Sequence, residues 1–294
     1  MNKPILLLKK ELLKPIEQAL TRIEKIRERK VNNADSIILE GLFALGVSSF
    51  EHSLIDTLRT LFLHIPDKLD LKTEAITKEE LINGNPLKQA IENKLNSVSY
   101  KNISDILKYF ADKTGINDDL VSEDEMNSLL ELKATRNLLI HNNLMINSIY
   151  KETAGPSSRN DNHRLTITQD YLFESIVVLR SILETFKVAL LDKYKTYTKI
   201  NATKNLFKYI FPTPIMHFEN EFELLEDEDR IGAMKTETSR RVNLSGSETF
   251  LFGMWIAHSH SVKFDFNAQY FYRLDVVNRE KFGYLIQEID LLKS

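Results

Sequence analysis

The stretch that decides the fold is residues 122–143, which read SEDEMNSLLELKATRNLLIHNN. Ser122 and Glu125 have the spacing of a capping box, and the two residues between them add negative charge where the helix dipole favours it. Helical spacing then continues through Met126, Leu129, Leu130, Lys133, Ala134 and Leu138. The pattern predicts one long helix over residues 122–150.

Long helices are predicted on both sides of this segment. The chain of 294 residues has only 9 glycines and 7 prolines, so helix breakers are scarce. Apolar spacing predicts helices at 5–30, at 34–64 (one buried helix, or two broken near Gly46), at 102–113 and at 166–199. The polar stretch 153–162 is predicted to be a loop. We therefore expect a mainly α fold, with a helical bundle over residues 1–200.

The composition changes near residue 201. Short, aromatic, partly alternating stretches at 242–244, 249–257, 262–266 and 269–276 predict strands, and 280–293 has the pattern of a closing helix. We predict a small α+β appendage over residues 201–294. Its aromatic side chains could stack on bases, but they more often form the core of a small sheet. They are Trp255, Phe264, Phe266, Tyr270, Phe271 and Tyr272.

Composition and missing motifs exclude several classes of function. The chain has no cysteine, so disulfides, thiolate zinc sites and cysteine nucleophiles are impossible. A net charge of −3 argues against a general nucleic-acid coat but permits a small basic patch. No glycine-rich phosphate loop or serine-hydrolase motif occurs. The apolar run Pro4–Leu8 is too short for a signal peptide, and we see no membrane span, so we expect a cytoplasmic protein.

Arg136, Asn137 and His141 have a spacing suited to chemistry on one helix. Asn137 and His141 share a helical face, and the long side chain of Arg136 can reach over it. Metal-free RNA cleavage needs a base for the 2′-hydroxyl proton and an acid for the leaving 5′-oxygen, and an imidazole can do either. A guanidinium can stabilise the phosphorane oxygens. These side chains are the groups that metal-free RNA cleavage needs, and that reaction would use no cofactor.

The segment from Arg136 to Asn142 resembles the R-x(4–6)-H motif of HEPN domains. It has the common form with a polar residue, Asn137, after the arginine and an asparagine after the histidine. The aromatic–acid pair that ends at Glu51 resembles a pair on an early HEPN helix. The resemblance covers at most about residues 1–200, and only the motif is specific.

The resemblance implies a bundle that dimerises with the two motif helices facing each other. Many HEPN domains are metal-independent endoribonucleases of toxin–antitoxin or antiviral defence systems. We therefore expect a homodimeric endoribonuclease that cleaves RNA, with tRNA a candidate substrate and an antitoxin or defence protein a candidate partner. The expected roles are general base or acid for His141, phosphorane stabilisation for Arg136, positioning of phosphate or imidazole for Asn137 and Asn142, and a salt bridge to Arg136 for Glu51. The alternative is a catalytically inactive HEPN module that dimerises or binds partners.

Simpler explanations compete with these roles. The motif could be a structural histidine beside a salt-bridged arginine, and Glu51 could be a plain interhelix ion-pair partner. Arg59 and His64 have the same spacing as the motif, which shows that spacing alone is not specific. They lack the following amides, and His64 is placed at a helix end. Arg159 and His163 lie closer together in the polar loop and receive little weight.

A second, weaker alternative is a metal site in the appendage. His258 and His260 alternate along a predicted strand, and Asp265 or His217 could add a ligand. A zinc site needs three or four ligands within reach, whereas the sequence establishes only two. An exposed strand face is the simpler interpretation.

Overall fold

The computed structural model describes residues 5, 7–70, 86–159, 163–198 and 201. The chain divides into two compact units, Lys9–Lys195 and a second formed by Met1–Leu8 with Thr196–Ser294. The first unit contains the helices described below. The predicted α+β appendage at 201–294 lies outside the described residues, except for Asn201.

The described part of the chain is mainly α-helical, as predicted, and forms a helical bundle. Its α-helices are α1 (Lys9–Arg27), α2 (Ser36–His64), α4 (Pro86–Ser99), α5 (Ile103–Thr114), α6 (Glu123–Asn142), α7 (Ser148–Ala154) and α8 (Gln169–Lys193). Short 3-10 helices occupy Pro66–Lys68 (η1) and Gly155–Ser157 (η2). Within these residues, β pairing is limited to an isolated bridge between Met145 and Arg164.

Most of these helices correspond to predicted ones with shifted ends. α1, α5 and α8 match the predictions at 5–30, 102–113 and 166–199. α2 passes Gly46 without a break, so the single buried helix is the correct alternative. α4 has no predicted counterpart. A proline at its first position and apolar residues at helical spacing were the signals that could have identified it.

α6 begins as predicted but ends earlier. The Ser122 side chain accepts a hydrogen bond from the Glu125 N–H, and the Glu125 carboxylate accepts one from the Ser122 N–H, so the capping box is complete. The helix ends at Asn142 because Asn143 adopts the left-handed conformation, with φ 46°. The predicted extension to Tyr150 is therefore wrong, and the chain turns before it forms the separate helix α7.

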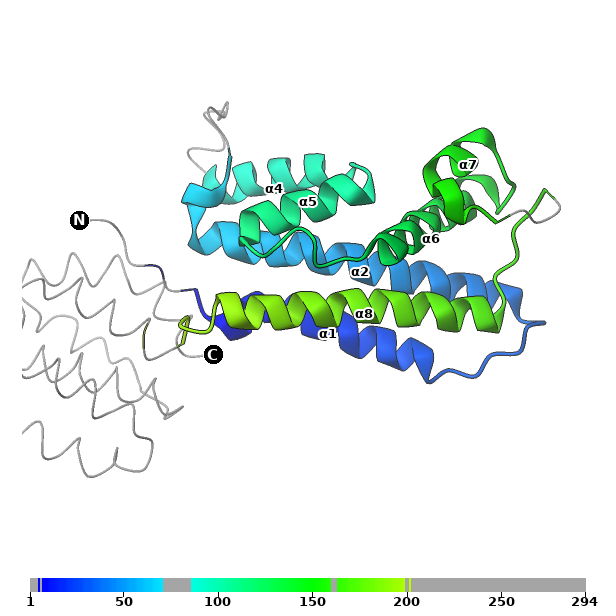
Figure 1. Cartoon of the computed structure of the whole chain (residues 1–294), viewed down its shortest axis with the longest axis horizontal. Helices are drawn as coiled ribbons and strands as arrows, with labels where there is room; N and C mark the ends of the chain where they lie inside the picture. The colour runs from blue at the N-terminus through cyan, green and yellow to red at the C-terminus, as the bar shows by residue number, and fades with distance from the viewer. Residues whose placement is uncertain (1–4, 6, 71–85, 160–162, 199–200, 202–294) are drawn as a thin grey trace, which may run out of the picture. The chain divides into compact units, whose positions relative to one another are not determined.

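Figure 1 shows α1, α2 and α8 as long neighbouring helices, with α4, α5 and α6 on the other side of α2. This central position explains why α2 buries side chains on more than one face. They include Phe43, Val47, Phe50, Leu54, Leu58 and Phe62. Phe110 of α5 packs against Phe186 of α8 with ring centroids 5.3 Å apart. The core therefore includes side chains on both sides of α2, where α1 and α8 pack on one side and α4, α5 and α6 on the other.

α2 is also long and apolar enough, by length and composition alone, to cross a membrane. It contains an 18-residue window that is strongly apolar and carries few charged residues. By this measure, our expectation that no segment could span is wrong. Core helices of globular proteins pass the same test, and 44% of this window is buried inside the bundle. The buried part of α2 packs against the neighbouring helices of the bundle.

Two glycines of α2 should respond in opposite ways to an added side chain. A Cβ at Gly41 would meet nothing within 4 Å, whereas a Cβ at Gly46 would lie 2.9 Å from Cδ1 of Ile176 in α8. We expect Gly41→Ala to raise the free energy of unfolding by about 0.5–1 kcal/mol through helix propensity. Gly46→Leu should lower it by about 1–3 kcal/mol by overpacking. Chemical denaturation followed by circular dichroism measures both, and a stabilised Gly46→Leu variant would contradict the close α2–α8 contact.

Candidate functional site

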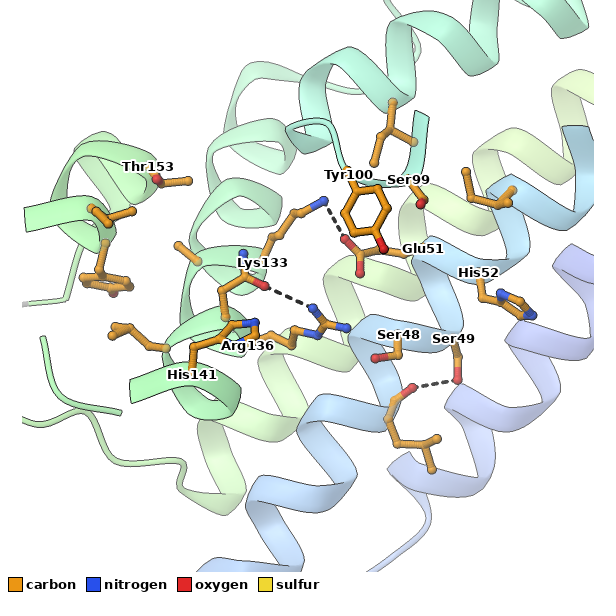
Figure 2. A pocket seen from close by; sticks show the side chains of 18 of the residues that line it. Ser48, Ser49, Glu51, His52, Ser99, Tyr100, Lys133, Arg136, His141 and Thr153 are labelled. Carbon is orange, nitrogen blue, oxygen red and sulfur yellow. Dashed lines mark hydrogen bonds and ion pairs between the residues drawn. The ribbon is translucent and has the colours of Figure 1, made fainter. Parts of the chain in front are cut away.

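A groove of about 930 Å³ is lined mainly by residues of α2, α4, α6 and α7. All five predicted site residues line it: Glu51 from α2 and Arg136, Asn137, His141 and Asn142 from α6. Figure 2 shows Glu51, Arg136 and His141 among the lining side chains, with Arg136 extending from α6 towards α2. Packing of α6 against α2 therefore brings the motif and the distant carboxylate into one site.

The lining of the groove is positively charged. Arg22, Arg59, Lys133 and Arg136 line it, while Glu51 is the single carboxylate among its lining residues in the described structure. The whole chain carries a formal charge of −3. Arg59 and Lys133 are paired with carboxylates, so the positive charge that is left over comes from Arg22 and Arg136 and favours the binding of anions.

Arg136 is one of two arginines in this groove, with Arg22, that have no carboxylate partner among the described residues. Its Nη1 donates a hydrogen bond to Oδ1 of Asn137 at 3.1 Å, and its buried Nε has no hydrogen-bond partner. Among the described residues it forms no ion pair with a carboxylate. The simple alternative of a salt-bridged arginine therefore does not describe this side chain. Its guanidinium keeps donors for a phosphate or another anion.

Arg59, which has the same spacing from His64, is placed differently. Its guanidinium donates to both carboxylate oxygens of Glu92, from Nε at 2.7 Å and from Nη2 at 3.1 Å, and Nη1 pairs with Asp56. The hydrogen bond from Arg59 lowers the pKa of the Glu92 carboxyl. The charge of Arg59 is therefore compensated, and His64 does not line the groove. Both Arg136 and His141 line the groove, whereas only Arg59 of the Arg59–His64 pair does.

Glu51 pairs with Lys133 rather than forming the expected salt bridge to Arg136. Nζ of Lys133 lies 2.8 Å from Oε1 of Glu51 and also donates to the carbonyl oxygen of Lys101 at 3.1 Å. Figure 2 shows the Lys133–Glu51 link across the groove. Lys133 lies about one turn before Arg136 on α6. Lys133, and not Arg136, therefore forms the ion pair with Glu51. Lys133 was not among the predicted site residues, although its spacing of three from Arg136 on one helix was the available signal.

His141 lies in the last turn of α6, and its side chain is exposed. Within the described structure the imidazole makes no hydrogen bond, so both ring nitrogens can face a ligand. The Asn142 side chain, in contrast, has a hydrogen-bond partner: its Nδ2 donates to the carbonyl oxygen of Met145 at 2.6 Å. Its side chain therefore stabilises the turn that ends α6. Asn137 meets its expected role more directly, since it contacts the Arg136 guanidinium.

A buried polar cluster around Glu131 of α6, which the sequence analysis did not identify, supports one wall of the groove. Glu131 is only 5% exposed. Its carboxylate accepts hydrogen bonds from the hydroxyls of Thr135 (2.6 Å), Tyr150 (3.0 Å) and Tyr171 (2.7 Å), and from Nε of Arg159 (3.2 Å). A buried carboxylate is tolerated here because one partner is a cation and both oxygens accept hydrogen bonds.

The Glu131 cluster joins α6 and α7 to α8 and to the segment before α8. The guanidinium of Arg159 lies 3.8 Å from the centre of the Tyr171 ring, and its backbone N–H donates to the Tyr150 hydroxyl at 3.1 Å. Burial raises the pKa of both tyrosines, which keeps their hydroxyls protonated as donors. Because Tyr150 also lines the groove, the cluster positions that wall. Arg159 is therefore structural, and the exposed His163 lies outside the groove.

In the described part of the chain, no three histidine, aspartate or glutamate side chains are grouped so that they could hold a metal ion. The weaker candidates of the appendage, His258, His260, Asp265 and His217, lie outside the described residues, as do its aromatic residues. No protein-family model, curated protein or solved structure matches the chain, so any functional argument depends on the motif and the groove.

Proposed function

We propose that this chain is a metal-independent endoribonuclease of the HEPN type. One observation carries the proposal: Arg136, which has no carboxylate partner among the described residues, shares a positive groove with the exposed imidazole of His141. The guanidinium is suited to phosphate oxygens and the imidazole to proton transfer. The resemblance of the motif to HEPN domains points to the same chemistry.

In the proposed reaction the RNA supplies its own nucleophile. The 2′-oxygen attacks the adjacent phosphorus while a base removes its proton. The bond from phosphorus to the 5′-oxygen then breaks, and an acid protonates that oxygen. The products are a 2′,3′-cyclic phosphate and a 5′-hydroxyl. Arg136 stabilises the charge on the phosphorane oxygens, His141 acts as base or acid, and Asn137 orients the guanidinium through its hydrogen bond.

We further propose that the enzyme is a homodimer in which the partner's copy of the motif supplies the second proton-transfer group. The surface around the motif supports this arrangement, because Ile140, Met145 and Ile149 are large apolar residues that are exposed at the end of α6 and the start of α7. All three lie between positions 140 and 149, and a contiguous patch of exposed apolar residues commonly marks an interaction site. A two-fold contact there would bring two copies of His141 to one phosphate.

The proposed biological role is that of a toxin or an antiviral defence protein acting on RNA in the cytoplasm. tRNA is a candidate substrate, and an antitoxin or defence protein is a candidate partner. This role rests on the resemblance of the motif alone. The appendage at 201–294 is available to select the RNA or to bind the partner.

The direct test is cleavage of total RNA and of a tRNA pool by the full chain in excess EDTA. We expect cleavage to persist in the chelator, because the proposed acid–base groups are side chains, and we expect fragments that end in a 2′,3′-cyclic phosphate. The matched control is an oligonucleotide with a single 2′-deoxy nucleotide at the mapped cleavage position. It should bind but remain uncut, because its nucleophile is missing.

The outcomes separate the candidate functions. Cleavage that requires added metal would overturn the proposed mechanism and favour a metal site in the appendage. RNA binding without cleavage, with or without metal, would favour the catalytically inactive module. Cleavage of the 2′-deoxy oligonucleotide would show that the reaction does not use the 2′-hydroxyl.

A further inference from the structure

Tyr100 is an exposed aromatic residue on the wall of the groove. It follows the last residue of α4, it is 90% exposed, and it lines the groove together with Asn96 and Ser99. In the described structure its ring stacks on no other aromatic ring, and its hydroxyl makes no hydrogen bond. Packing within the bundle therefore does not explain an aromatic side chain at this position.

Lys133 holds the turn that carries Tyr100 against the motif helix. Its Nζ donates to the carbonyl oxygen of Lys101, the residue directly after Tyr100, and pairs with Glu51. This bridge ties the turn after α4 to α6 and α2 at once. In Figure 2 the Tyr100 ring lies in the same part of the groove as the Lys133–Glu51 pair. The turn is therefore positioned, whereas the ring itself is left open to a ligand.

We infer that Tyr100 is a stacking platform for an unpaired nucleobase of the RNA whose phosphate lies at Arg136. This inference rests on the proposed function and assigns one part of its substrate site. An aromatic ring offers a flat apolar face to any base, and a base inside a duplex has no free face to offer. The subsite therefore takes single-stranded or looped RNA and is tolerant of base identity.

The test is the affinity of the full chain for a short single-stranded RNA, measured in a His141→Ala background so that the RNA is not cleaved. We expect Tyr100→Ala to weaken binding by about 5- to 150-fold, the range that base–aromatic stacking produces. Tyr100→Phe should bind like tyrosine, because the ring is retained and the hydroxyl has no partner in the described structure. Phe173→Ala, which removes an exposed aromatic ring of α8 outside the groove, is the matched control and should bind normally.

A second measurement identifies the stacked base. An abasic nucleotide is placed at each position of the RNA in turn. At one position it should weaken RNA binding by the protein that keeps Tyr100, but it should not weaken binding by the Tyr100→Ala variant any further. Unchanged affinity in Tyr100→Ala, or an equal loss in Tyr100→Phe, would overturn the stacking role and leave the proposed ribonuclease intact. Absence of any RNA binding by the chain would overturn the proposed function and the inference together. Circular dichroism of each variant verifies the fold.

Discussion

Replacement of His141 by alanine is expected to slow RNA cleavage in EDTA by about 10²- to 10⁴-fold, the usual contribution of a general acid or base. RNA binding should change little, because the exposed imidazole is proposed to move protons rather than to anchor the substrate. Single-turnover cleavage gives the rate, and binding is measured separately on the 2′-deoxy oligonucleotide. The loss should therefore appear in the rate of the chemical step rather than in affinity.

His64→Ala is the matched control for this experiment. His64 has the same spacing from an arginine as His141, but it does not line the groove. Its variant should cleave RNA at the wild-type rate. If His141→Ala and wild type cleave equally fast, the assignment of His141 as the catalyst is wrong, whatever the structure of the groove.

Replacement of Glu131 by alanine should lower the free energy of unfolding by roughly 3–5 kcal/mol, the cost of breaking a buried ion pair from one side. The variant leaves the Arg159 guanidinium without its carboxylate and removes the acceptor of the Tyr150 and Tyr171 hydroxyls. Unsatisfied buried donors add to the cost of the missing charge. Chemical denaturation of the full chain, followed by circular dichroism, measures the change.

Glu152→Ala provides the control, since Glu152 is an exposed glutamate of α7. We expect its free energy of unfolding to lie within about 0.5 kcal/mol of wild type. Glu131→Gln tests the charge separately from the hydrogen bonds. It keeps an acceptor for the tyrosines but leaves Arg159 unpaired, so its loss should be intermediate. A Glu131→Ala variant as stable as Glu152→Ala would show that the cluster does not hold α7 to α6.

The extent of the helices was only partly predictable from local sequence. The start of α6 could be read from Ser122 and Glu125 because a capping box involves residues within one turn. Its end was missed although Asn143 was a local signal for it, because apolar spacing continues past Asn142 and suggested a longer helix. The unbroken course of α2 through Gly46 depends on tertiary contact, since α8 packs directly against that glycine.

The residues of the candidate site were predicted better than their contacts. Spacing within one helix placed Arg136, Asn137 and His141 together, because the helical repeat determines which residues share a face. Spacing could not reveal that Glu51 would pair with Lys133, since two cations on one face compete for a carboxylate from another helix. It also could not separate this motif from the pair that begins at Arg59, whose carboxylate partners come from its own helix and from α4.

The sequence by itself therefore determined the helical class of the described bundle and the set of groups carried by the motif helix, because both depend on interactions between residues a few positions apart. The tertiary structure alone decided which arginine keeps its donors free, which cation neutralises Glu51, and that Glu131 is buried with Arg159. These outcomes depend on which helix faces meet, and ion pairs form only between groups that packing brings within about 4 Å.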